Sequence, residues 1–513
     1  MKIERYFLLF ILVLPALLLR DFTPNNELKY LSIADEAIRN GDWLTFYNHG
    51  TIYADKPPLY FWIIMLCKIL WGKHSMFLLS LFSVIPALVT IGIMDRWTRE
   101  CSLSSRWSVA LLLFTSGLFL GSALVLRMDM MMCMFITLSL YIFYKRYTDQ
   151  ERKPNHFWLP FCIFMALFSK GPIGIIVPVC SIVFFLILKK EIRQFGKFLG
   201  WKEFTVLATL CLVWFGCVFR EGGYEYLYDL LFHQTINRAV DSFQHKEPLW
   251  YYGITIWYAL APWSLFYILI LVTGIWKRLI TTDKEKFFFS VIATTFIILS
   301  LFSSKLDIYL LPIYPFVAYL SILLFPKIKE KWIRFTLYIP IILFILALPV
   351  SFFLTDQIEF IRPFCIRLGI GILSVSALFA FVYLRRHNIL RAIQAAALGL
   401  LISIFVSSFA FPKLNPTLGF SALTQKALEI INKGSIENLY FYRFRSGENM
   451  DVYLHRPLFK IKEKEEMFRV YDKGKNLIFI KIWDVQKSPE LREWLSRTRY
   501  TAIGKFYIIE KPN

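Results

Sequence analysis

A carboxylate and a lysine lie close together at two places in the first long polar segment of the chain: Glu27 and Lys29 near its start, and Asp55 and Lys56 near its end. A carboxylate can accept a proton from an attacking hydroxyl. Lysine side chains can hold a phosphate and neutralise it as it leaves. This combination suits a phosphate-bearing lipid and one proton transfer.

Further polar residues lie in other short segments between apolar runs. They are Arg127, Asp129, Lys170, Arg238, His245, Lys305 and Tyr309. Charged groups near the ends of membrane spans are costly unless they serve a cavity or a partner, so we predict that these residues belong to the same outer site. Alternatively, Lys170 and Lys305 extend their ammonium groups to the membrane surface, and His245 is purely structural.

The other candidates also have structural interpretations. Glu27 suits the first turn of a helix. Asp55 and Lys56 precede a Pro-Pro turn, where a local ion pair would contribute little to stability. Arg127 and Asp129 could form an ion pair that holds two helices together. Residue types alone leave both interpretations open.

The composition indicates that a membrane-embedded helical frame positions these residues. Hydrophobic residues make up 57% of the 513-residue chain, against roughly 45–50% in a soluble domain. The 58 Lys and Arg against 37 Asp and Glu indicate cytoplasmic loops that follow the positive-inside bias. Because the basic residues are scattered between apolar runs and form no dense patch, nucleic-acid binding is disfavoured.

The apolar runs predict about thirteen membrane spans, with a cytoplasmic N-terminus and an outer C-terminal tail. The runs are 6–19, 76–94, 107–125, 130–147, 157–169, 173–188, 203–219, 251–275, 287–302, 307–325, 335–354, 363–383 and 392–411. The short run Leu59–Trp71 is placed along the outer membrane interface, because only one of two neighbouring runs can cross if Arg96 is cytoplasmic. The outer loops are then 20–75 and 220–250.

Residues 1–411 are predicted to form the transmembrane domain, and residues 412–513 a small extracytoplasmic α/β domain. Within this tail, three runs have the β-branched and aromatic composition of strands: 439–442, 477–480 and 506–509. Residues 488–497 predict a helix that begins at a Ser-Pro pair. The predicted fold class is a polytopic α-helical membrane protein with a C-terminal α/β domain.

The polar segments resemble those of a known enzyme family. They are Arg20-Asp21, Asn26-Glu27-Leu28-Lys29-Tyr30, Gly41-Asp42-Trp43, Tyr53-Ala54-Asp55-Lys56-Pro57-Pro58-Leu59-Tyr60, Lys170-Gly171-Pro172, Trp250-Tyr251-Tyr252, Pro262-Trp263 and Ser304-Lys305 with Tyr309. Together they resemble the aminoarabinose-transferase-like branch of the bacterial protein O-mannosyltransferase superfamily, which has the multi-span GT-C fold. The resemblance covers residues 1–315 and the general layout of the tail.

The resemblance implies an inverting glycosyltransferase that moves a sugar from a polyprenyl-phosphate carrier to an outer acceptor. The implied partners are this lipid-linked sugar and a glycolipid such as lipid A, or a protein, within the lipid bilayer. The sugar stays open between 4-amino-4-deoxy-L-arabinose and another pentose or a hexose. The implied location is the bacterial inner membrane, with the site and the C-terminal domain facing the periplasm.

One position departs from the family pattern. The family has an Asp-Glu pair followed by an Arg and a Tyr, and the matching residues here are Asn26, Glu27, Lys29 and Tyr30. An amide cannot act as a base, so we predict that Glu27 orients or deprotonates the acceptor, with Asp55 as the alternative. Lysine in place of arginine keeps the charge but loses a bidentate grip on phosphate.

The resemblance also suggests how the donor phosphate is held. We expect four residues to bind it: Lys29, Lys56, Lys305 and Tyr309. Glu27 or Asp55 could in addition bind a divalent cation such as Mg²⁺, Mn²⁺ or Zn²⁺, since carboxylate oxygens are suitable ligands. No dedicated cluster of ligands in the sequence requires such an ion.

Three other functions compete with this interpretation. A transporter or flippase for a charged lipid would also have many spans and intramembrane charges, but here the polar residues gather on one face. A catalytically silent lipid-glycan binding protein is consistent with Asn26. An oligosaccharide polymerase or ligase would share the cationic outer loops, but its donor would carry pyrophosphate.

Overall fold

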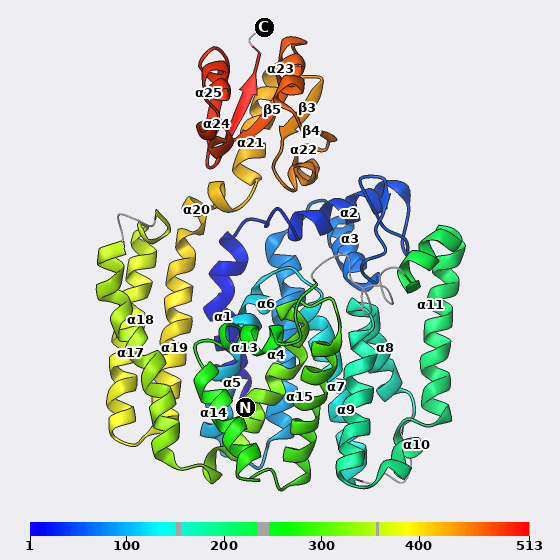
Figure 1. The fold of residues 1–513 in the computed structure, drawn as a ribbon, viewed down its shortest axis with the longest axis vertical. Helices are drawn as coiled ribbons and strands as arrows, with labels where there is room; N and C mark the ends of the chain where they lie inside the picture. The colour runs from blue at the N-terminus through cyan, green and yellow to red at the C-terminus, as the bar shows by residue number, and fades with distance from the viewer. Residues whose placement is uncertain (150–154, 233–245, 355–358, 435, 512–513) are drawn as a thin grey trace.

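The computed structural model describes residues 1–149, 155–232, 246–354, 359–434 and 436–511. It shows a tall helical bundle with a small sheet domain above one end (Figure 1). Two helices of the first outer loop, α2 (Glu27–Asn40) and α3 (Leu59–Trp71), lie where the bundle meets the sheet domain. A short hairpin, β1 (Tyr47–Asn48) and β2 (Thr51–Ile52), connects them. The first loop is therefore a layer between the two parts of the molecule.

Apolar helices form the bundle. They are α1 (Ile3–Leu19), α4 (Met76–Trp97), α5 (Leu103–Phe114), α6 (Gly117–Leu124), α7 (Asp129–Asp149), α8 (Trp158–Lys170), α9 (Ile173–Leu188), α11 (Trp201–Tyr228), α13 (Tyr251–Ala259), α14 (Ser264–Trp276), α15 (Asp283–Leu301), α16 (Tyr314–Leu324), α17 (Glu330–Leu354), α18 (Phe364–Arg385) and α19 (Ile389–Ser407). A short helical segment, η3 (Asp307–Ile313), precedes α16, and α10 (Phe195–Phe198) precedes α11.

The described part of the chain contains six helices long and apolar enough to cross a membrane, or seven if α5 and α6 form one bent span. The other helices do not meet both conditions, and α8 and α14 have only 13 residues each. A span through hydrocarbon needs about 20 residues unless neighbouring protein shelters its ends. The multi-span architecture is thus clear, whereas the total of about thirteen spans stays a prediction.

Two runs predicted as continuous spans are each broken into two helices, which corrects the prediction for 107–125 and 251–275. α5 and α6 meet at 70°. α13 ends at Ala259 and α14 begins at Ser264, with Pro262 between them. Proline has no backbone N–H for a helical hydrogen bond, and composition alone did not reveal how this would divide the run.

The two breaks pack against each other. Gly117 N donates to Ala261 O at 2.7 Å, and Trp263 Nε1 donates to Thr115 Oγ1 at 2.8 Å. A Cβ atom at Gly117 would lie 3.3 Å from Ala261 O, so glycine permits this close approach. The hydrogen bond from Gly117 to Ala261 pairs backbone groups that the two helix breaks leave without a helical partner. Such pairing within the protein is what a membrane interior requires.

The C-terminal domain contains a five-stranded mixed sheet and surrounding helices. Its elements are α20 (Phe411–Leu418), α21 (Ser421–Lys433), β3 (Asn438–Tyr442), α22 (Asp451–Leu454), β4 (Leu458–Ile461), α23 (Lys464–Asp472), β5 (Asn476–Lys481), α24 (Ile482–Lys487), α25 (Pro489–Ser496), β6 (Arg499–Ile503) and β7 (Phe506–Glu510). The strand order is β4-β3-β5-β7-β6, with β4, β3 and β5 parallel. β7 pairs antiparallel with both β5 and β6.

The predicted strands and helix of this domain are confirmed as β3, β5, β7 and α25. The sequence did not indicate β4 and β6, which are the two edge strands. The two middle residues of β4 are exposed, and no residue of β6 is fully buried, so both strands lack the continuous apolar run of a central strand such as β5. Burial on both faces is what made the central strands recognisable.

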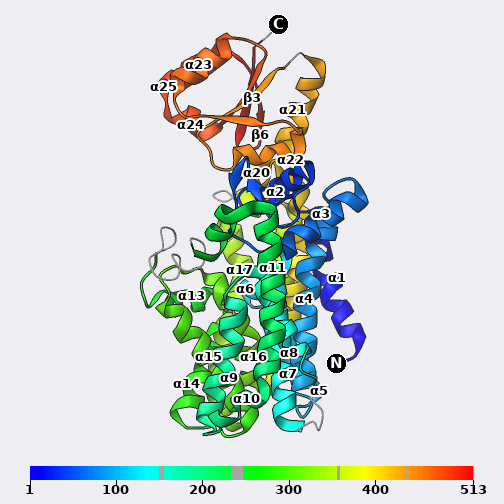
Figure 2. The same ribbon diagram turned by 90° about the vertical axis from the view of Figure 1, so that its right-hand side faces the viewer.

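The first loop holds the C-terminal domain in place. Asp21 Oδ1 accepts from Tyr453 OH at 2.9 Å, and Asp21 Oδ2 accepts from Ser421 N at 2.9 Å. Asn415 Nδ2 donates to Leu19 O at 2.9 Å. These contacts join the end of α1 to three segments of the domain, which lies directly above α2 (Figure 2).

Candidate functional site

Two adjoining cavities are lined in part by the same residues. The larger has a volume of about 580 Å³ and is lined mainly by apolar side chains of α8, α9 and α11, among them Leu167, Ile176 and Trp214. The smaller has a volume of about 280 Å³ and mainly polar walls. Four residues line both: Asp55, Lys56, Ser304 and Tyr309. We call the two spaces the apolar cavity and the polar chamber, and the four residues the junction.

The polar chamber takes its walls from segments far apart in the sequence. The start of α2 contributes Asn26, Lys29 and Tyr30, and the segment before α7 contributes Arg127. The C-terminal domain contributes residues from the range 445–449. The structure thus brings together most of the candidates that the sequence singled out, and cationic side chains predominate among the charged ones.

Two aromatic side chains shape the chamber near α2. Burial raises the pKa of the Tyr30 phenol, and the positive charge of Arg127 offsets part of this rise in pKa. Tyr30 is therefore a neutral hydrogen-bonding group at ordinary pH. Lys29 Nζ lies 4.3 Å from the centroid of the Tyr53 ring, a cation–π contact that holds the ammonium group at the chamber wall.

Asp129 is fully buried at the start of α7 and positions two cations. Arg127 Nε donates to Asp129 Oδ2 at 3.0 Å, and Lys170 Nζ donates to Asp129 Oδ1. Lys170 lines the apolar cavity and lies 4.6 Å from the centroid of the Tyr309 ring. One carboxylate thus holds two basic side chains beside the junction.

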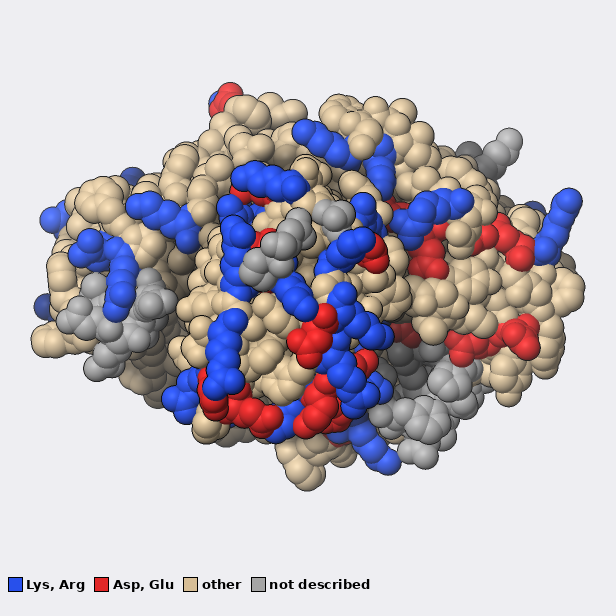
Figure 3. All heavy atoms as spheres, turned by 90° about the horizontal axis from the view of Figure 1, so that it is seen from above, with Lys and Arg blue, Asp and Glu red and all other residues tan. Residues whose placement is uncertain are grey.

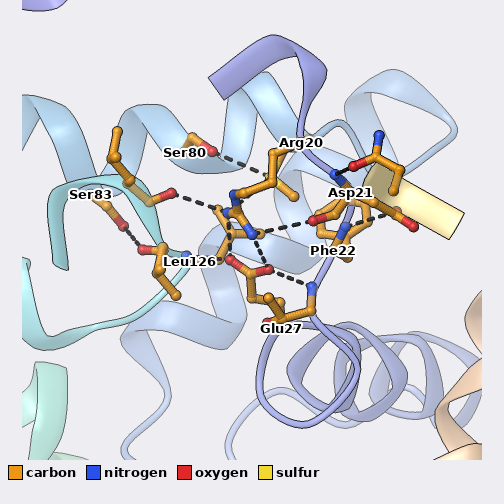
Figure 4. Close-up of polar contacts among 12 residues, drawn as sticks. Arg20, Asp21, Phe22, Glu27, Ser80, Ser83 and Leu126 are labelled. Carbon is orange, nitrogen blue, oxygen red and sulfur yellow. Dashed lines mark hydrogen bonds and ion pairs between the residues drawn. The ribbon is translucent and has the colours of Figure 1, made fainter. Parts of the chain in front are cut away.

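Glu27, predicted as the base, is completely buried and its carboxylate is fully engaged (Figure 4). Arg20 Nη1 and Nη2 donate to its two oxygens at 2.7 Å each. Thr23 N donates to Oε2 at 2.7 Å, and Leu126 N donates to Oε1 at 2.8 Å. An ionised carboxylate has about four acceptor positions, and these contacts occupy them.

The position of Glu27 therefore suits an anchor better than a proton acceptor. Its contacts join the end of α1, the start of α2 and the segment that follows α6. Among the described cavities, it lines neither the polar chamber nor the apolar cavity. Asp55, the alternative that the sequence offered, lies at the junction instead.

Lys305, predicted as a phosphate ligand, has a structural position. Its Nζ donates to Phe302 O at 2.6 Å and to Glu247 O at 2.8 Å, and the residue is only 3% exposed. Lys246 and Ser304 form an antiparallel bridge beside it. Lys305 thus fastens the end of the second outer loop, and we do not assign it to the phosphate. Arg238 and His245 lie outside the described residues.

The described residues at the chamber form no ready-made cluster of metal ligands. Of the described residues, no three His, Cys, Asp or Glu side chains lie close enough together to hold one. The junction carboxylate Asp55 is accompanied in the cavity walls by Lys56, Arg127 and Lys170, and cations repel a divalent ion. The divalent cation, Mg²⁺, Mn²⁺ or Zn²⁺, stays a prediction that the removal of divalent cations can test.

Sequence reasoning missed the contribution of the C-terminal domain. Arg445, Ser446, Glu448 and Asn449 line the polar chamber, and they follow β3 in the parallel part of the sheet. Ligand sites in parallel sheets lie at the carboxyl ends of strands, so the polar run after a predicted strand was the signal that could have found them. Seen from this end of the molecule, basic side chains predominate among the charged ones (Figure 3).

Comparison with known proteins agrees with this geometry. Residues 55–219 match the family described as dolichyl-phosphate-mannose-protein mannosyltransferase. An uncharacterised protein of Aquifex aeolicus is 26% identical over 58% of this chain and 58% of its own length. An undecaprenyl phosphate-alpha-4-amino-4-deoxy-L-arabinose arabinosyl transferase of Serratia proteamaculans is 25% identical over 56% of this chain and 52% of its own length. The chain thus matches little more than half the length of these relatives.

A solved structure extends the likeness to the whole fold. The crystal structure of ArnT from Cupriavidus metallidurans bound to undecaprenyl phosphate superposes with a TM-score of 0.77 at 16% identity, covering 100% of this chain and 99% of that one. The same protein in the apo state gives a TM-score of 0.76. The resemblance predicted from the first loop is confirmed, and with it the fold class: a multi-span GT-C membrane protein with a small C-terminal domain.

Proposed function

We propose that this protein is a membrane glycosyltransferase that moves a sugar from a polyprenyl-phosphate carrier to an acceptor outside the cytoplasm. One observation carries the proposal: an apolar cavity and a polar chamber adjoin at Asp55, Lys56 and Tyr309. A lipid-linked sugar has the same order of parts, with a long apolar chain, a phosphate and a polar ring. The chain would occupy the apolar cavity, the phosphate the junction and the sugar the chamber.

The bond changes of the transfer follow from this placement. An oxygen of the acceptor forms a bond to the anomeric carbon while the bond from that carbon to the phosphate oxygen breaks. Attack from the face opposite the phosphate inverts the anomeric configuration. The electron pair of the broken bond stays on the phosphate, and Asp55 accepts the proton of an acceptor hydroxyl. If the acceptor is already ionised, as a phosphate is, Asp55 orients it without taking a proton.

The cations at the junction favour the transition state over the ground state. The donor phosphate is a diester with one negative charge, and it leaves as a monoester on which a second charge develops. Lys56 lines the junction, and the basic side chains of Arg127 and Lys170 are held beside it by Asp129. Their attraction therefore grows as the bond breaks, which is the condition for raising the rate rather than only tightening binding.

The substrates and the location are part of the proposal. Relatives named as undecaprenyl phosphate-alpha-4-amino-4-deoxy-L-arabinose arabinosyl transferases favour an undecaprenyl-phosphate pentose as the donor. A glycolipid is the acceptor that we propose first. Residues 55–219 match a family described as dolichyl-phosphate-mannose-protein mannosyltransferase. A hexose donor and a protein acceptor are therefore the second option. The proposed location is a bacterial inner membrane, with chamber and C-terminal domain on the periplasmic side.

An in vitro transfer assay tests the proposed function. Purified protein in detergent would receive radiolabelled undecaprenyl-phosphate sugars and a membrane lipid extract, with protein acceptors in a parallel series. Label transferred to an acceptor supports the proposal. If the carrier binds but no label moves, the protein is a silent lipid-sugar binding protein. A parallel reaction with a pyrophosphate-linked donor identifies a polymerase or ligase if only that donor is consumed. In proteoliposomes, movement of the unaltered donor from one leaflet to the other would indicate a transporter.

Lys56→Ala should weaken carrier binding. Removing a charge-assisted hydrogen bond of this kind costs about 1.5–3 kcal/mol, which corresponds to a roughly 10- to 100-fold higher Kd for undecaprenyl phosphate. Binding is measured by titrating the lipid into detergent-solubilised protein. Lys73→Ala is the matched control, because Lys73 is an exposed lysine of the same outer segment. Equal Kd values for Lys56→Ala and the control would remove Lys56 from the phosphate site.

Removal of divalent cations should leave sugar transfer intact. Lys and Arg side chains supply the positive charge that a metal ion would otherwise place on the leaving phosphate, and the described residues offer no fitting ligand set. The initial rate of transfer is measured after dialysis against EDTA and again after adding Mg²⁺, Mn²⁺ or Zn²⁺. A rate that falls with EDTA and recovers with one of these ions would contradict this expectation.

A further inference from the structure

The segment after β3 connects the C-terminal domain to the polar chamber. We call residues 443–450 the C-terminal loop. It begins at the carboxyl end of a strand flanked on both sides by parallel neighbours, β4 and β5, which is where parallel sheets place their ligand sites. Four of its residues line the chamber opposite the predicted first-loop residues: Arg445, Ser446, Glu448 and Asn449.

The loop is held rigidly against the first outer loop. Ser446 Oγ donates to Asn25 Oδ1 at 2.8 Å, and Asn449 Nδ2 donates to Pro24 O at 3.0 Å. A Cβ atom at Gly447 would lie 2.4 Å from the ring of Phe441, so only glycine permits this path of the chain. Ser446 and Asn449 are both buried. The loop is therefore a fixed wall of the chamber.

Asn449 has a buried acceptor with no partner among the described residues. Its Nδ2 is committed to Pro24 O, which fixes the orientation of the amide. Its Oδ1 is buried and accepts no hydrogen bond from any residue that the structure describes. Asn449 is 2% exposed and lines the chamber. An unsatisfied acceptor of this kind costs about 1–3 kcal/mol, which a ligand donor would recover.

We propose that Glu448 and Asn449 recognise the sugar of the lipid-linked donor by accepting hydrogen bonds from its hydroxyl or amino groups. This inference rests on the proposed function, because the donor's phosphate at the junction places its sugar in the chamber. The chamber volume of about 280 Å³ lies at the lower end of the ~300–1,000 Å³ of small-molecule sites. It therefore suits a single sugar ring, and the C-terminal domain selects which ring is transferred.

The test compares binding of the bare carrier with binding of sugar-loaded carriers. The probes are undecaprenyl phosphate, undecaprenyl-phosphate glucose and undecaprenyl-phosphate 4-amino-4-deoxy-L-arabinose, titrated into the full-length protein in detergent. The variants are Glu448→Gln and Asn449→Ala, and the matched control is Glu437→Gln, which removes an exposed carboxylate of the same domain. Melting temperatures confirm that each variant is folded.

We expect both variants to bind the bare carrier as the wild type does. Their affinity for the preferred sugar-loaded carrier should fall by about 10-fold in Glu448→Gln, where a charged acceptor becomes a neutral one, and by about 10-fold or less in Asn449→Ala, where a neutral acceptor is lost. Unchanged preference among the three lipids in both variants would overturn the inference and leave the proposed function standing. A wild type that does not bind undecaprenyl phosphate would overturn the proposed function itself, and this inference with it.

Discussion

Asp55→Asn is expected to lower the kcat of sugar transfer to an acceptor hydroxyl by about 10²- to 10⁴-fold, the usual contribution of a positioned general base. Asparagine keeps the size and hydrogen bonds of the side chain but cannot accept the proton. Asp55 lines both the junction and the polar chamber, so in the proposed placement it lies between the donor phosphate and the sugar, close to the anomeric carbon that joins them. Binding of undecaprenyl phosphate should be unchanged or tighter, because the substitution removes a negative charge near the phosphate.

Asp42→Asn is the matched control for this prediction. Asp42 is a partly exposed carboxylate of the same outer segment and lines neither of the two cavities. Its amide variant should retain the wild-type kcat. Equal rates for Asp55→Asn and wild type with a hydroxyl acceptor would exclude Asp55 as the base.

The amide at position 26 offers a second arm of the same experiment. Asn26 lines the polar chamber together with Asp55, and the family pattern has an acid at this position. Asn26→Asp in the Asp55→Asn background should restore part of the lost kcat, because it returns a carboxylate to the same chamber. A double variant as slow as Asp55→Asn alone would show that position 26 does not reach the acceptor.

Glu27→Gln is expected to destabilise the protein rather than to remove a catalytic group. The substitution leaves the partly buried guanidinium of Arg20 without its bidentate, fully buried carboxylate. Breaking a buried ion pair by removing one partner costs about 3–5 kcal/mol, a large share of the ~5–15 kcal/mol that stabilises a typical domain. The protein should express poorly and melt at a lower temperature in detergent, and the fraction that stays folded should retain transfer activity.

Arg39→Gln provides the comparison for Glu27→Gln. Arg39 lies on the exposed part of the same helix, so losing its charge should leave the melting temperature nearly unchanged. The informative quantity is kcat per folded molecule, obtained by titrating folded protein with labelled carrier. A Glu27→Gln protein with the wild-type melting temperature and no transfer would return the base to Glu27.

The two carboxylates show why sequence alone could not assign the base. Glu27 and Asp55 are both acidic residues of one polar loop beside a lysine-containing motif, and their local sequences do not distinguish them. The difference comes from Arg20 and from the backbone N–H of Leu126, which meet Glu27 only when α1, α2 and the end of α6 are packed together. Burial and hydrogen-bond saturation are properties of that packing.

Much of the architecture followed from the sequence because it depends on local composition. Apolar runs marked the helices of the bundle, since a hydrocarbon environment demands long uninterrupted apolar segments. The central strands β3 and β5 were recognisable because burial on both faces gives continuous apolar runs. The first-loop motif indicated the proposed chemistry, because cations and carboxylates in one polar loop suit a phosphate donor and a proton transfer.

Contacts between distant segments were decided only by the tertiary structure. The break at Pro262 packs against the break at Thr115, Lys305 fastens a loop instead of lining the chamber, and Asn449 is fixed by the carbonyl of Pro24. The two residues of each pair lie far apart in the sequence. The spacing of apolar and polar residues along the chain therefore does not predict that they are in contact. The sequence by itself therefore determined the membrane frame and the residue types of the site, whereas packing decided which side chains face the substrate and which hold the frame together.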